Sequence, residues 1–132
     1  MSDVSWPLQT AVFSMLSPLM APVLVYDQIA PAGAVPPYVV IGDQTSDEDG
    51  DKTQDMERVT LTMHVFSRSS SRKEVKELAA KVKKSLHQKV LTPAGFDPVQ
   101  LFWEFTTDFL EDETMTKHAV IRFGALVTTT TV

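Results

Sequence analysis

The chain has 132 residues, of which 43% are hydrophobic and none is cysteine, and its formal net charge is -5. This length fits one domain, the composition excludes a wholly disordered chain, and the lack of cysteine excludes disulfides and cysteine-based zinc sites or nucleophiles. No apolar run approaches the roughly 18 residues that a membrane-spanning helix needs, and the N-terminus does not read as a secretory signal, so we expect no membrane partner.

The first part of the chain predicts one helix and two strands. Apolar residues recur at helical spacing from Leu8 to Leu19, which predicts a helix over residues 5–17 that Pro18 ends. Residues 23–29 predict a short strand, and residues 38–43 predict a second strand beyond a proline-rich connector.

An acidic segment follows the second predicted strand. Seven acidic residues lie between Asp43 and Glu57, against the single base Lys52. Low hydrophobicity and self-repulsion predict a flexible acidic loop at about 44–56. Because residues 68–89 carry eight bases and only two acids, charge is strongly segregated along the chain.

The second part of the chain predicts three more strands and a second helix. Residues 57–66 alternate, Ser71 and Glu74 have the spacing of a capping box, and the helix that they start runs to about Gln88. Residues 99–110 and 117–128 alternate again and predict an antiparallel hairpin. The side chains expected to face the core are Val59, Leu61, Met63, Val65, Val99, Leu101, Trp103, Phe105, Phe109, Ala119, Ile121, Phe123, Ala125 and Val127.

This order of elements predicts an α+β fold. Two amphipathic helices cannot bury their apolar stripes on each other and leave five strands uncovered. We therefore expect a two-layer sandwich over residues 1–132, in which a mostly antiparallel five-stranded sheet carries two helices on one face.

No motif for catalysis, cofactor binding or metal binding stands out. His64 and His118 lie on predicted outer strand faces and His87 ends a helix, and none has a second ligand at a typical spacing. The acidic segment does not fit a calcium loop in either possible register, and no nucleophile motif or glycine-rich phosphate loop occurs. We expect no catalytic residue, no cofactor and no metal, and we interpret the lysine-rich helix as a solvated surface.

The outer face of the predicted sheet is more apolar than a solvated face needs. Phe66, Phe102, Val120 and Leu126 lie there among threonines, which predicts that other protein covers part of this face. With an acidic loop and a basic helix, the chain has complementary patches of the kind that join copies head-to-tail. The candidate interaction residues are Asp47, Glu48, Asp49, Asp51, Asp55, Phe66, Lys81, Lys83, Lys84, Phe102, Val120 and Leu126.

The pattern resembles a known family. An N-terminal helix, the motif V-L-V-Y-D, a proline-rich connector and P-Y-V-V-I-G-D at residues 37–43 are similar to the tail completion, or tail terminator, proteins of long-tailed bacteriophages and gene transfer agents. The strand at residues 61–68, the helix at 74–86 and the strand at 117–123 follow in the same order.

The resemblance implies a structural role without catalysis. Members form a ring, commonly a hexamer, that caps the tail tube, ends tube polymerisation and presents the tail-side surface for head-tail joining. The implied partners are other copies of the chain, the tail tube protein and the head completion or connector protein. DNA would pass through the lumen without specific binding, and the protein would lie at the head-proximal end of the virion tail after assembly in the bacterial cytoplasm.

Two other interpretations remain open at this stage. One is a nonviral cytoplasmic adaptor domain of the same shape that binds a protein partner through its sheet face. The other is an enzyme with a metal site built from His64, His118 and nearby acids.

Overall fold

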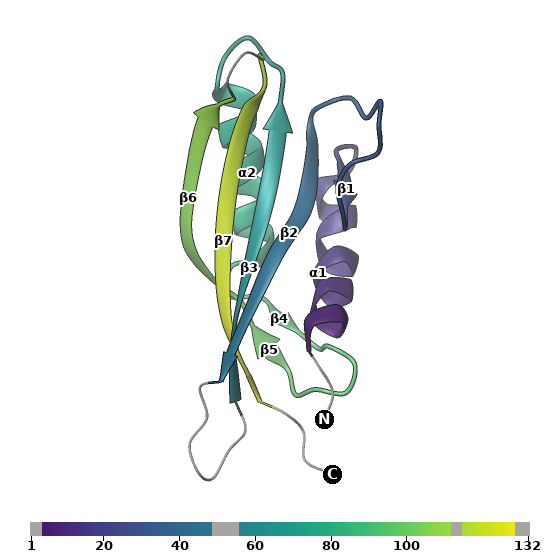
Figure 1. The fold of residues 1–132 in the computed structure, drawn as a ribbon, viewed down its shortest axis with the longest axis vertical. Helices are drawn as coiled ribbons and strands as arrows, with labels where there is room; N and C mark the ends of the chain where they lie inside the picture. Colours follow the sequence, from purple (N-terminus) through teal and green to yellow (C-terminus); the bar gives the residue numbers. More distant parts are fainter. Residues whose placement is uncertain (1–3, 49–55, 112–114, 129–132) are drawn as a thin grey trace.

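The computed structural model describes residues 4–48, 56–111 and 115–128, and it contains a five-stranded sheet in the order β1-β2-β3-β7-β6 (Figure 1). Strand β1 is parallel to β2, and the other neighbouring pairs are antiparallel. A second sheet is a hairpin of β4 and β5, which the sequence did not predict. The elements are α1 (Ser5–Met20), β1 (Leu24–Tyr26), β2 (Tyr38–Glu48), β3 (Met56–Ser67), α2 (Lys73–Leu86), β4 (Val90–Leu91), β5 (Val99–Gln100), β6 (Phe102–Leu110) and β7 (Lys117–Thr128).

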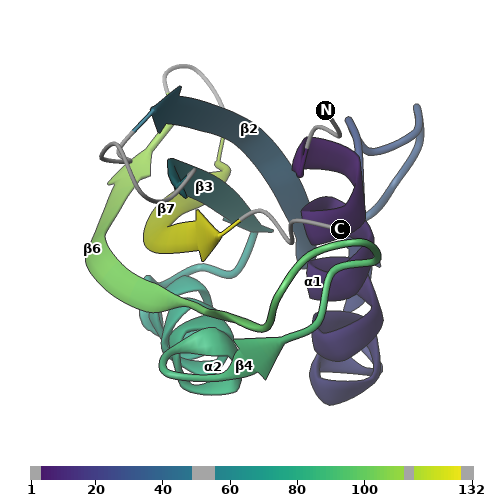
Figure 2. The ribbon, with the colours of Figure 1, turned by 90° about the horizontal axis from the view of Figure 1, so that it is seen from below.

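Both helices lie on the same side of the sheet, as Figure 2 shows, so the predicted α+β sandwich is confirmed. The uninterrupted pairing of β3 and β7 turns every second side chain toward the helices. Each fully buried aliphatic or aromatic side chain contributes about 1.5–3 kcal/mol of transfer free energy. The core-facing side chains of these two strands are Val59, Leu61, Met63, Val65, Ala119, Ile121, Phe123, Ala125 and Val127.

Helix α2 is attached to the edge strand β6 by polar contacts along its length. Asp108 pairs with Lys76 at 2.8 Å and with Arg72 at 3.5 Å. About two turns further along the helix, the Lys83 ammonium lies 3.6 Å from the centre of the Trp103 ring. The backbone N–H of Trp103 donates to His87 Nδ1. Several bases of this helix therefore hold the fold together rather than only face water.

Three predictions about the helices are wrong. Helix α1 continues past Pro18 to Met20, because the fixed φ of proline is compatible with a helix. The Pro18 ring faces outward, and the Met20 side chain is buried in the core. Leu19, predicted in the buried stripe, is exposed. The capping box does not form, because Glu74 accepts a hydrogen bond of 2.6 Å from Ser67 at the end of β3, and α2 starts without a side-chain cap and ends at Leu86.

The prediction of an acidic loop at 44–56 includes residues at both of its ends that belong to strands in the structure. Strand β2 continues through Glu48 and β3 begins at Met56, so residues 44–48 pair with residues 57–61 of β3. The strand tolerates these polar residues because cross-strand contacts such as Ser46 with Glu57, at 2.7 Å, satisfy them. Residues 49–55 lie outside the described part of the chain.

The prediction that Phe105 and Phe109 face the core is also wrong. The register of β6 against β7 shifts between Trp103 and Phe105, and this irregularity reverses the alternation. Trp103 packs against the core, whereas Phe105 and Phe109 are exposed on the other face. The predicted single strand 99–110 is in fact split into β5 and β6.

A pair of leucine substitutions tests which face is the core. Leu61→Ala in β3 should lower the free energy of unfolding by about 2–5 kcal/mol, because it leaves a cavity in the interior. The matched change Leu126→Ala in β7, where the side chain is 50% exposed, should cost less than about 1 kcal/mol. Urea titrations monitored by tryptophan fluorescence compare the two, and equal costs would contradict the assigned faces.

Candidate functional site

The outer face of the sheet, opposite the helices, carries the apolar residues that the sequence singled out. Phe66 pairs with His118, Phe102 pairs with Gly124, and Leu126 pairs with Arg58. The side chains of these pairs point to the outer face. Phe102 is 46% and Leu126 50% exposed, while Phe66 and Val120 are half-buried. Neither helix covers this face, so its apolar area is available to other molecules.

Rings from all five strands of the sheet gather at one end of this face, in a group that we call the aromatic cluster. The ring centroids of Phe66 and His118 are 4.3 Å apart, and those of Phe109 and His118 are 4.8 Å apart. The remaining contacts extend the cluster across β2 to β1. Its members are Tyr26, Tyr38, His64, Phe66, Phe109 and His118.

A pair of hydrogen-bonded histidines lies at the centre of the aromatic cluster. His64 Nδ1 is 2.8 Å from His118 Nε2, and His118 Nδ1 is 3.0 Å from Glu111 Oε1. When His118 donates its Nδ1 proton to Glu111, its Nε2 is left to accept a hydrogen bond from His64 Nδ1. The sequence placed both residues on outer strand faces and brought them together only in the metal-enzyme interpretation, whereas the fold joins them by a hydrogen bond across 54 positions.

This arrangement favours neutral imidazoles. Burial lowers the pKa of His64 from its ordinary value of 6.5, and the proximity of His118 lowers it further, while Asp43 acts in the opposite direction. Burial also lowers the pKa of His118, against the raising effect of Glu111. Protonating the pair therefore works against the fold.

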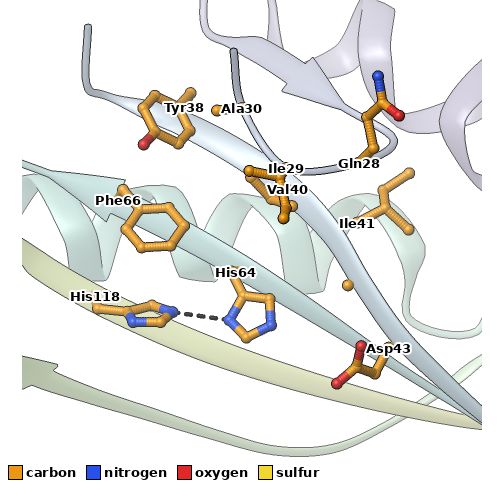
Figure 3. Close-up of a pocket in the computed structure, with 11 residues that line it drawn as sticks. Gln28, Ile29, Ala30, Tyr38, Val40, Ile41, Asp43, His64, Phe66 and His118 are labelled. Atoms are coloured by element: carbon orange, nitrogen blue, oxygen red, sulfur yellow. Dashed lines mark hydrogen bonds between the residues drawn. The ribbon is translucent and has the colours of Figure 1, made fainter. Parts of the chain in front are cut away.

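A hollow of about 530 Å³ opens beside the histidine pair, between the outer face and the connector after β1 (Figure 3). A register shift in β2 between Ile41 and Gln44 brings the exposed Asp43 side chain to its rim. Gly42 lies directly under the ring of His64, where a Cβ atom would come within 2.7 Å of that ring. The lining residues are Gln28, Ile29, Ala30, Tyr38, Val40, Ile41, Gly42, Asp43, His64, Phe66 and His118.

A second hollow, of about 350 Å³, lies on the same face where Phe102 and Leu126 are exposed. It is bordered by Arg58 and by Glu104, whose carboxylate pairs with Arg122 at 2.9 Å. The outer face thus has two recesses, each with an aromatic wall and an acidic group. A flat solvated sheet face does not need such recesses.

The charged candidate residues are dispersed. Asp47 is exposed near the end of β2, and Glu48 ends that strand, whereas Asp49, Asp51 and Asp55 lie outside the described residues. Lys81 and Lys84 are exposed on α2, and Lys83 is held by Trp103. Only Phe66 of the predicted residues lines the histidine hollow, and Asp43, His64 and His118 were not among them.

The metal-enzyme interpretation needs a group of metal ligands around His64 and His118. Within residues 4–48, 56–111 and 115–128, no group of three or more histidine, cysteine or carboxylate side chains is placed to hold a metal ion. In the same ranges, no helix has the length and apolar character to cross a membrane.

A comparison with protein families decides between the remaining interpretations. The family model described as tail completion protein gp17 matches residues 10–128 of this chain. The chain belongs to this family. The resemblance drawn from P-Y-V-V-I-G-D and the order of elements is thereby confirmed, and a tail completion protein is a structural protein rather than an enzyme.

Individual proteins agree with this tail completion family. The tail completion protein gp17 of Bacillus phage SPP1 is 31% identical over 86 residues, which is 65% of this chain and 63%, or less than two thirds, of that relative. Its solved structure has a TM-score of 0.58 at 26% identity over 96% of this chain and 91% of that one. A chain in the virion of a native gene transfer agent particle has the same fold, with a TM-score of 0.84 at 22% identity over 97% and 99% of the two chains.

The histidine pair of this tail completion protein predicts a pH-dependent stability. Because both folded-state pKa values are lowered, the unfolded chain takes up protons first as the pH falls below about 6.5, so the stabilisation present above that pH is lost below it. The free energy of unfolding should be smaller at pH 5.5 than at pH 7.5. The double variant His64→Asn, His118→Asn should lose less over the same interval, and equal losses in urea titrations would contradict the assignment.

Proposed function

We propose that the chain is a virion protein that caps the tail tube as a ring, ends tube polymerisation and joins the tail to the head. The observation that carries this proposal is the family match over residues 10–128. The fold shared with a chain of the gene transfer agent virion supports it, as does the uncovered apolar face. The tail tube protein and a head connector protein are the partners that this role requires.

Opposite faces of the molecule carry complementary surfaces. The exposed lysines of α2 lie on one side of the sheet, and the aromatic cluster and both hollows lie on the other side. Surfaces that face opposite ways join copies head-to-tail, and such contacts close into a ring when the rotation between copies permits. A hexamer is the ring size that the family resemblance implies.

The acidic residues between β2 and β3 have a place in this proposal. They follow the end of β2, which is held in place by its pairing with β3. From this fixed point they can bind a neighbouring subunit, the tube or the connector. If they line the lumen, their charge repels DNA phosphates over roughly a Debye length, about 8 Å at physiological salt, and DNA passes without specific binding.

Loss of the chain tests the proposed role most simply. In the strain that produces the particles, deletion of the coding sequence should yield separate heads and tails, with tubes of irregular length in negative-stain images. Expression of the wild-type chain from a plasmid should restore joined particles of uniform tail length. Complete particles of normal length without the chain would overturn the proposal.

Neutralising the acidic segment separates its role from folding. Replacing Asp49, Asp51 and Asp55 with asparagine keeps the length of the segment and should change the free energy of unfolding by less than about 1 kcal/mol. The same variant should reduce the fraction of joined particles in the complementation assay. If it instead unfolds the isolated chain, the segment is a structural part of the domain.

A further inference from the structure

The hollow beside the histidine pair has walls that suit one kind of side chain. Tyr38 and Phe66 contribute aromatic surface, Val40 and Ile29 contribute aliphatic surface, and the Asp43 carboxylate stands at the rim (Figure 3). An anion would be repelled by Asp43, and a purely apolar group would bury that carboxylate without a partner. A long basic side chain fits both parts, because its methylene stem packs on apolar walls while its charge meets aromatic faces and the carboxylate.

Helix α2 offers basic side chains of this kind. Arg72 and Lys76 are held by Asp108, and Lys83 is held by Trp103. Lys81 and Lys84, three positions apart on the same helix face, are exposed, and no ion pair to them is found in the part of the chain that the structure describes. They lie across the sheet from the hollow, so they can reach only the hollow of another copy.

We propose that the hollow beside His64 and His118 receives Lys81 or Lys84 from α2 of a neighbouring copy, and that acid releases this contact. The inference rests on the proposed ring and names one of its subunit contacts. Charge complementarity selects the occupant, since residues 68–89 carry eight bases, whereas Asp43 is the only charged side chain that the described lining contributes when the histidines are neutral.

The release by acid follows from what faces the histidine pair. Asp43 on β2 and Glu111 after β6 supply negative charge, Tyr38 supplies a phenol ring, and no lysine or arginine belongs to the described lining. With both imidazoles neutral, the hollow favours a cation. A proton on either imidazole places positive charge in the same hollow as the incoming lysine, and the two repel each other.

Self-association of the purified chain tests the proposal by sedimentation velocity at pH 7.5 and 5.5. The wild type should associate at pH 7.5, and Asp43→Asn or the double variant Lys81→Glu, Lys84→Glu should weaken association about tenfold or more. The swapped variant, with Asp43→Lys added to both lysine changes, should recover most of it. Acidification to pH 5.5 should weaken the wild type more than the double variant His64→Asn, His118→Asn.

Asp47→Asn is the matched control, because Asp47 is an exposed acid on the same strand outside the lining. An equal effect of Asp47→Asn, no effect of Asp43→Asn, or a wild type that stays monomeric to about 1 mM would each overturn the contact. The proposed function fails separately, when particles are complete without the chain. If joined particles need the chain but still form with Asp43→Asn, the result would contradict this contact and leave the proposed function intact.

Discussion

The structure depends on the burial of one face of the central strand pair β3 and β7. Their alternating side chains give a continuous apolar surface toward the helices, and both helices take that side. The period of two then fixes which residues point the other way. The outer face with its aromatic cluster is therefore a consequence of how the core is made, and its apolar content is what a joining role can use.

The sequence predicted the core of this fold well because alternation is a local signal. Val59 to Val65 and Ala119 to Val127 were assigned to the correct face from period alone, because β3 and β7 pair along their whole length without a register shift. The prediction failed where the register shifts. In β6 the shift after Trp103 moved Phe105 to the outer face, and propensity gives no warning of such a shift.

Strand alternation also predicts some residues of the candidate site and not others. The positions of Phe66 and Leu126 on the outer face follow from alternation, so the sequence could predict them. The histidine pair could not be predicted in this way, because His64 and His118 meet only when β3 lies beside β7 in one particular register. Asp43 likewise reaches the hollow through the irregularity in β2, which strand periodicity alone does not reveal. Their common position on outer strand faces was the available signal.

Family membership and the geometry of the face support each other. The family match covers most of the chain and indicates a structural role at the phage tail. The recesses on the outer face and the basic side of α2 are consistent with the ring that we propose, since a ring needs two different surfaces on each copy. Part of the helix charge already serves the fold through Asp108 and Trp103, so only the remaining lysines are available for a partner.

The central claim is that the outer face of the sheet meets other protein in the particle. Hydroxyl-radical footprinting with mass spectrometry, applied to the isolated chain and to assembled particles, measures this directly at Phe102 and Leu126, which are exposed in the chain alone. We expect strong labelling of both residues in the isolated chain and clear protection of both in the particle. Equal labelling of both residues in the two states would contradict the central claim.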